Sequence, residues 1–170
     1  NLGGSYNIIV RHMRFRVGSN ADGTYIPGAP FNLENGGNFI LDHCSFSWSA
    51  EEALGMYDDL NQTVQWCMFT EGLYAAGHPK GSRAYGPVVG GVNTSFHHNL
   101  IAHTVSRSPR FGCSDAIDNH QFIDFVNNVN YNWGKANACY GGENERNKWG
   151  SSRINIQNNY YKPGPAYDGT

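Results

Sequence analysis

Apolar and polar residues alternate along six short segments of the chain, which is the period of a β-strand with one buried face. The segments cover residues 7–15, 38–46, 62–69, 93–101, 122–130 and 153–161. Val, Ile, Phe and Thr dominate them, and loops rich in Gly and Asn, such as "ENGGN" and "VVGGVNT", lie between them. No stripe of apolar residues with a helical period is present. The pattern predicts an all-β chain.

The six segments also recur at a nearly constant distance. A marker residue near the end of each gives the series Met13, Cys44, Cys67, Asn99, Asn128 and Asn159, with separations of 31, 23, 32, 29 and 31 residues. A repeat of this length is typical of a stacked solenoid. We therefore predict a right-handed parallel β-helix of about six turns, with equivalent residues ~4.8 Å apart. The longer intervals must carry loops, which in solenoids gather on one face and build a binding site.

Stacked turns place the marker residues in one column. Asn99, Asn128 and Asn159 are expected to form a ladder in which each side-chain amide bonds to the next turn. Cys44 and Cys67 fall in the same column, so we expect them to be buried free thiols.

The composition agrees with many strands joined by tight turns. The chain has 21 Gly and about 20 Asn among 170 residues, and both residue types adopt left-handed backbone conformations readily. The net charge of −2 gives no basic field for nucleic acid, and no run of 18 apolar residues could span a membrane. None of the four cysteines forms a CxxC pair, which disfavours a zinc site. A disulfide between Cys113 and Cys139 stays open.

Several motifs resemble one known family. "NFILDHCSFSWSAEE", "HPKG", "SFHHNLIAHTVSRSPRFG" and "INIQNNYYKPGP" occur in this order, and together they resemble the bacterial branch of the polysaccharide lyase family that contains the pectate lyases. The resemblance covers nearly the whole chain. It implies cleavage of polygalacturonate or pectin by β-elimination, in a secreted or periplasmic protein. Such lyases are longer, so residues 1–170 are expected to be a single β-helix domain truncated at one or both ends. We expect a monomer, or contacts through the ends of the coil if it is truncated.

The resemblance also assigns roles to cationic residues. It makes Arg107 the base that removes the C5 proton of a uronate, and Lys80 a substrate-binding residue. Arginine is almost always protonated, so a neighbouring cation or calcium would have to favour its neutral form. Arg110 can bind a carboxylate bidentately, but its odd separation from Arg107 needs a bend at Pro109 for both to reach one substrate. Arg83 is expected to line the same cleft.

Calcium is implied by the resemblance, because pectate lyases hold Ca²⁺ with carboxylates that bridge it to the uronate. Glu51 and Glu52 stand where the family has an acidic pair, so they are the candidate ligands. A further family aspartate is replaced here by Ala29, unless Asp22 or Asp58 takes its part. A calcium-independent lyase therefore remains an alternative.

Other polar and aromatic residues are expected to be structural. Asp42 and His43 should join strand and loop by hydrogen bonds. The tryptophans are expected to be mostly stacked or in the core, with one or two left to face sugar rings. Two further functions are kept open: a glycoside hydrolase, which needs two opposed carboxylates, and a non-catalytic or inactive β-helix that binds the uronate polymer.

Overall fold

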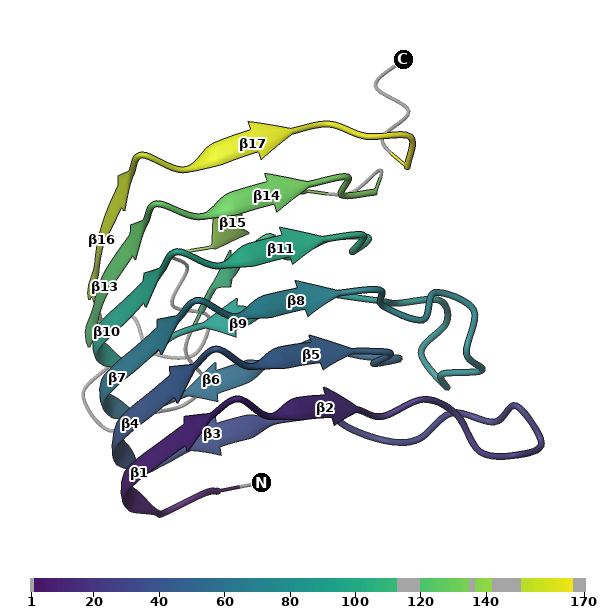
Figure 1. Ribbon diagram of the computed structural model, residues 1–170, viewed down its shortest axis with the longest axis horizontal. Coiled ribbons are helices and arrows are strands. Elements are labelled where there is room, and N and C mark those ends of the chain that lie inside the picture. The colour runs from purple at the N-terminus through teal and green to yellow at the C-terminus, as the bar shows by residue number, and fades with distance from the viewer. Residues whose placement is uncertain (1, 113–119, 135–136, 142–150, 167–170) are drawn as a thin grey trace.

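The chain winds into a solenoid of short strands, as seen in a computed structural model that describes residues 2–112, 120–134, 137–141 and 151–166. Each turn contributes one strand to each of three sheets (Figure 1). The first sheet contains β1 (Tyr6–Arg11), β4 (Gly37–Asp42), β7 (Leu60–Gln65), β10 (Val92–His97), β13 (His120–Val126) and β16 (Ser151–Gln157). The second contains β2 (Arg14–Arg16), β5 (Ser45–Ser47), β8 (Met68–Thr70), β11 (Leu100–Ala102), β14 (Val129–Tyr131) and β17 (Tyr160–Lys162). The third contains β3 (Asn32–Glu34), β6 (Gly55–Tyr57), β9 (Val88–Val89), β12 (Arg110–Phe111) and β15 (Tyr140–Gly141).

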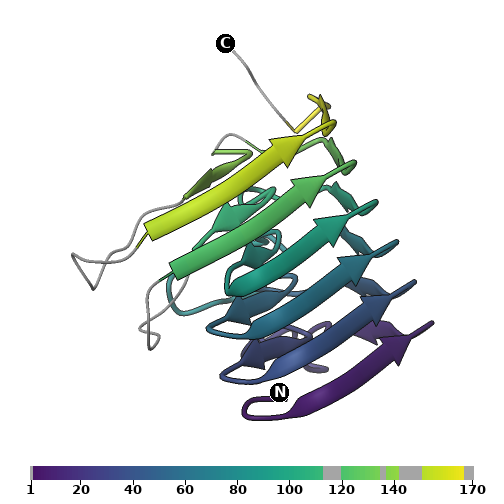
Figure 2. The ribbon, with the colours of Figure 1, turned by 90° about the vertical axis from the view of Figure 1, so that its left-hand side faces the viewer.

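Every neighbouring pair of these named strands is parallel, and Figure 2 shows the strands of the first sheet side by side in chain order. The predicted parallel β-helix is therefore confirmed. Two sheets have six strands and the third has five, so the number of complete turns is slightly below the expected six. The described residues contain no helix long and apolar enough to cross a membrane.

The predicted asparagine ladder lies at the corner between the first and second sheets. The Asn99 amide oxygen accepts from the Cys67 backbone N–H at 2.8 Å, and its Nδ2 donates to the Val64 carbonyl at 2.9 Å. Asn128 accepts from the Asn99 N–H at 2.9 Å, and Asn159 accepts from the Asn128 N–H at 2.9 Å. The ladder thus satisfies backbone groups at a buried corner where no strand pairing does so.

The two cysteines of this column are free and buried, as the repeat predicts. The Cys44 backbone N–H points to the Cys67 sulfur at 3.4 Å, in the position that an asparagine oxygen takes in later turns. Burial raises the pKa of the Cys67 thiol to about 12, so both packing and protonation make it inert. Cys139 is also a free thiol, whereas Cys113 lies outside the described residues.

Phenylalanines, rather than tryptophans, fill the core. Phe15, Phe46 and Phe69 stack in consecutive turns at ring distances of 4.8 and 4.9 Å, and Phe96 and Phe125 continue the apolar interior. The tryptophans were expected to be stacked or in the core: Trp66 and Trp133 pack on other rings, none of the described tryptophans is buried, and Trp149 lies outside the described residues. Trp66 is 52% exposed and Trp48 is also exposed.

An outward column of rings contains Trp66 in a stacked position, which is one of the two expected for the tryptophans. His43, Trp66 and His98 stack along the solenoid axis, with 4.5 Å between the rings of Trp66 and His98. All three residues have a positive φ of 53–56° and immediately precede the marker residues. The His98 ring therefore packs on one face of Trp66, while about half of the Trp66 side chain stays exposed.

Asp42 lies beside this column and is structural, as expected. It accepts hydrogen bonds from Arg11 Nε at 2.7 Å, His43 Nδ1 at 2.6 Å and Gln65 Nε2 at 3.1 Å. Burial alone would raise the pKa of Asp42, but these hydrogen bonds outweigh it and lower the pKa to about 2.

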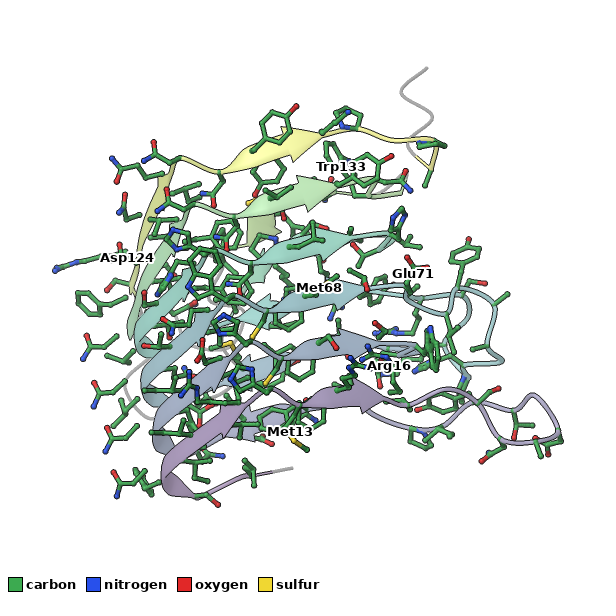
Figure 3. All side chains as sticks on the ribbon, viewed as in Figure 1. Met13, Arg16, Met68, Glu71, Asp124 and Trp133 are labelled. Atoms are coloured by element: carbon green, nitrogen blue, oxygen red, sulfur yellow. The ribbon has the colours of Figure 1, made fainter. Side chains whose placement is uncertain are left out.

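Long loops leave the solenoid after β2 and after β8 and project to the same side (Figure 1). Figure 3 places Glu71 at the start of the second of these loops, and Asp124 on the far side, on the outer face of the first sheet. The prediction that inserted loops gather on one face is therefore met at these two positions.

Replacing Asn99 with Ala should lower the free energy of unfolding by about 2–4 kcal/mol, because it leaves the buried Cys67 N–H and Val64 carbonyl without partners. Urea denaturation measures this. The control is Asn155→Ala, which removes an exposed bond to Asp124 and should change stability by less than about 0.5 kcal/mol. Equal losses in both variants would contradict a structural role for the ladder.

The buried carboxyl group of Asp59 should make the folded state more stable at low pH than at high pH. Its carboxyl is fully buried and accepts from Gly36 N–H at 2.6 Å through Oδ1, whereas Oδ2 has no hydrogen-bond partner in the described structure. Burial, together with the charges of Asp58 and Glu34, raises the pKa of Asp59 to about 6 despite the Gly36 bond. The folded state therefore favours the protonated form of Asp59. The stability that this preference contributes is fully present below pH ~4 and is lost as the pH rises through about 6.

Asp59→Asn should accordingly raise the melting temperature at pH 8 relative to the wild type, and should raise it much less at pH 4. The stability gain at pH 8 is at most about 3 kcal/mol. Asp42→Asn is the opposite control: it removes a carboxylate that is stabilised when charged, so it should lower the melting temperature at both pH values. A destabilised Asp59→Asn at pH 8 would count against the shifted pKa.

Candidate active site

Three consecutive turns bring charged residues together just before the strands of the third sheet. Glu52 forms a parallel bridge with Tyr85 in the next turn, and Tyr85 forms one with Ser106 in the turn after that. Glu51, Arg83 and Arg107 are close to these positions in sequence. Residues 33 and 21 positions apart are therefore stacked within contact distance.

The charged side chains form a connected set, which we call the ionic cluster: Glu51, Glu52, His78, Arg83 and Arg107. Arg83 Nη2 lies 3.5 Å from Glu51 Oε1 and 3.6 Å from Glu52 Oε1, so this arginine bridges both carboxylates. Arg107 Nη1 donates a hydrogen bond to the same Glu52 oxygen. The side chains of Arg83, Arg107 and Glu52 are only 12%, 14% and 13% exposed, so solvent screens these ion pairs weakly.

Tyr85 lies between the two arginines and packs against both. Its ring centre is 4.6 Å from the Arg83 guanidinium carbon and 4.3 Å from that of Arg107. Cation–π contacts of this kind add to the ion pairs in fixing the guanidinium planes. The Nε atoms of both arginines are buried and have no hydrogen-bond partner in the described structure. The cluster therefore holds two rigid cations with donor capacity left over.

His78 links the cluster to the loop that carries Lys80. Its Nδ1 accepts a hydrogen bond from the Lys80 backbone N–H at 3.0 Å, and its Nε2 lies 3.3 Å from Glu51 Oε1. Because Nδ1 is an acceptor, the proton must be on Nε2, where it can be donated to Glu51. The His78 ring also packs on Tyr25, with 4.5 Å between ring centres, which ties the loop after β2 to the same place.

The charges of the cluster affect the pKa of Tyr57, which lies in the neighbouring strand β6. Burial raises the pKa of Tyr57 to about 12, and the charge of Glu52 adds to this effect. Arg107 and Arg110 act in the opposite direction. Both arginines of "SRSPR" therefore lie close enough to act on one phenol, although they are an odd number of residues apart.

The structure brings together four of the six residues expected at the site: Glu51, Glu52, Arg83 and Arg107. Arg110 begins β12 at the edge of this group. Lys80 joins it through the backbone contact to His78, and its exposed side chain is not part of the described ion pairs. The site residues expected from sequence are thus neighbours in space, with Lys80 and Arg110 at the rim.

Sequence reasoning missed Tyr85, the residue on which both arginines pack. No signal for it was present in the sequence, because Ala84 between Arg83 and Tyr85 has a positive φ of 68° and the alternation of an extended segment does not apply there. The ion pairs themselves left no trace in the sequence, because they join residues of different turns.

The cluster is a poor fit for calcium. Ca²⁺ takes six to eight oxygen ligands, whereas among the described residues no group of three or more His, Cys, Asp or Glu is placed to hold a metal ion. Ala29 stands in the turn that pairs with the turn of Glu52, through Asn32 beside Gly55, and has no carboxylate to offer. Asp22 does not replace it, because Thr24 donates to its carboxylate in an exposed loop at 2.6 and 2.9 Å.

Known proteins with similar sequences support the resemblance that the motifs indicate. The chain is 31% identical over 158 residues to a probable pectate lyase C of Aspergillus flavus, which is 92% of this chain and 33% of that protein. It is 30% identical over 159 residues to a probable pectate lyase C of Aspergillus terreus, covering 93% and 33%. Over nearly its whole length the chain is similar to proteins named probable pectate lyase. No family model matches it. A third relative, from Emericella nidulans, is 28% identical over 182 residues.

The pectate-lyase-like chain spans about a third of the length of the first two relatives. These relatives are fungal, so the expected bacterial branch stays a prediction. The match covers the segments that carry the ionic cluster, since it includes more than nine tenths of this chain.

Replacing Glu52 with Gln should lower the free energy of unfolding by about 1–3 kcal/mol, because two weakly screened guanidinium groups lose their shared anion. Thermal or urea denaturation measures the loss. Glu71→Gln is the matched control, since the Glu71 carboxylate lies 3.8 Å from His103 Nε2 and its side chain is 59% exposed. Its stability should change by less than about 0.5 kcal/mol, and a similar loss in both variants would show that the cluster carries no special energy.

Proposed function

We propose that this chain carries the active site of a polysaccharide lyase that cleaves polygalacturonate by β-elimination, with Arg107 as the base. The observation that carries the proposal is the packing of Arg83 and Arg107 on Tyr85 beside the loops, in a chain whose relatives are named probable pectate lyases. Lys80 and Arg110 at the rim are the proposed contacts for further uronate carboxylates. A secreted or periplasmic location follows from a polymeric substrate outside the cell.

The proposed reaction needs a base and fixed positive charge. The base takes the C5 proton of a uronate, the C5–H electron pair forms the C4–C5 double bond, and the C4–O bond breaks. The leaving oxygen then takes a proton from solvent. Negative charge builds up on the uronate carboxylate in the transition state, and guanidinium groups held in place before the reaction stabilise it.

The protonation state of Arg107 is the critical point of this mechanism. Its hydrogen bond to Glu52 favours the charged form, which cannot accept a proton. A uronate carboxylate that paired with Arg107 would favour the charged form as Glu52 does, so the base role requires the substrate carboxylate to pair with the other cations of the site. Once Arg107 leaves Glu52, the nearby Arg83 cation acts on it by like-charge repulsion and favours its neutral form. We therefore place the base step after substrate binding has broken the Arg107–Glu52 contact.

The second candidate is a β-helix that binds the uronate polymer without cleaving it. The ion pair between Arg107 and Glu52 favours it, because a permanently paired arginine can bind anions but cannot act as a base. Hydrolysis is disfavoured, since Glu51 and Glu52 share one bridging arginine instead of facing each other across a sugar.

The lyase proposal is tested by incubating the chain with polygalacturonate, once with calcium and once with chelator, and following ultraviolet absorbance of the unsaturated product. Arg107→Lys should lower the rate by about 10²–10⁴-fold, the usual contribution of a general base. Arg153→Lys is the control, because Arg153 packs on Phe122 outside the cluster; its rate should be unchanged. Polymer binding without product in either buffer would support the second candidate and end the first.

A further inference from the structure

The negative charges of Glu51 and Glu52 in the ionic cluster are balanced by arginines of the protein itself. Arg83 lies within 3.6 Å of an oxygen of each carboxylate, and Arg107 donates to one of them. A divalent cation held by Glu51 and Glu52 would have to share these carboxylates with the arginines that already pair with their Oε1 atoms. It would then face two guanidinium groups that the fold keeps within a few ångströms by packing them on Tyr85.

Counting charges at the cluster gives zero. Glu51 and Glu52 contribute two negative charges, and Arg83 and Arg107 contribute two positive ones. His78 contributes none, because the Lys80 N–H donates to its Nδ1 and only Nε2 is left to carry a proton. A neutral cluster does not attract Ca²⁺, whose binding strength depends on the number of charged ligands.

We infer that Arg83 takes the place of a bound divalent cation, so that this site receives the uronate chain without calcium. This inference rests on the proposed function and specifies how its anionic substrate is recognised: the uronate carboxylate meets arginine N–H donors instead of a metal ion. Arg83 is suited to this role because its guanidinium is planar. The N–H groups along its edge can hold both carboxylates while one flat face packs on Tyr85.

Metal binding can be measured without substrate by calorimetric titration of Ca²⁺ into the chelator-treated chain, with thermal melting in calcium and in chelator alongside. The wild type should show no saturable binding tighter than ~1 mM and no shift in melting temperature. Arg83→Gln should bind Ca²⁺ at least tenfold more tightly and should melt at a higher temperature in calcium, because the carboxylates then carry an uncompensated charge. Arg153→Gln removes the same charge outside the cluster and should behave as the wild type.

Saturable wild-type binding of one Ca²⁺ near ~10 µM, or lyase activity that chelator abolishes and calcium restores, would overturn the inference. A folded Arg83→Gln variant that gains no affinity would also overturn it. If this variant does not fold, the wild-type titration and melting curves still decide. Absence of unsaturated product in every buffer would instead remove the proposed function, and would leave the metal measurement as it stands.

Discussion

The parallel register between successive turns is the constraint on which the rest of this structure depends. It places each residue directly beside its equivalent in the next turn. Each side chain must therefore be able to pack against, or hydrogen-bond to, the equivalent side chain above and below it. At the corner between the first two sheets the strands stop, and buried backbone N–H groups lose their partners. Asn99 and Asn128 restore them with side-chain amides. Where the column changes to cysteine, the Cys67 sulfur accepts from the Cys44 N–H at 3.4 Å, a weaker bond in an apolar corner. The column therefore changes from polar to apolar without breaking the register.

The same register builds the site. Stacked turns convert separations of 33 and 21 residues into direct contact, which is how Glu52, Tyr85 and Ser106 come to be neighbours in three turns. The strands there are short, and the loops after β2 and β8 can vary without disturbing the sheets. Tyr25 from the first loop and His78 from the second pack together and so join both loops to Glu51. The scaffold fixes the turns, and the loops determine which charges meet between them.

Strand positions in the first two sheets could be predicted from sequence, because alternation and the marker column are both local signals. The third sheet could not, since β9 and β12 have only two residues each and two residues show no period. The outward rings of His43, Trp66 and His98 were missed for another reason: their positive φ reverses the side-chain direction, and a tryptophan there gives no local sign of it. At the site, the residue types were predictable from the motifs. Their pairing was not, because the bridge from Arg83 to both glutamates depends on how a loop of one turn meets the previous turn.

The Arg107–Glu52 ion pair gives the site two opposing properties. It stabilises two weakly screened charges that the fold could not leave unpaired, and it keeps Arg107 protonated. A base at this position can therefore work only when Arg107 leaves Glu52 without pairing with another anion. Arg83 remains between the two glutamates throughout, so Glu52 keeps a partner when Arg107 leaves it. The bridge made by Arg83 thus explains how one arginine could be released for chemistry without leaving a buried carboxylate uncompensated, and it assigns to a side chain the charge that a metal ion would otherwise supply.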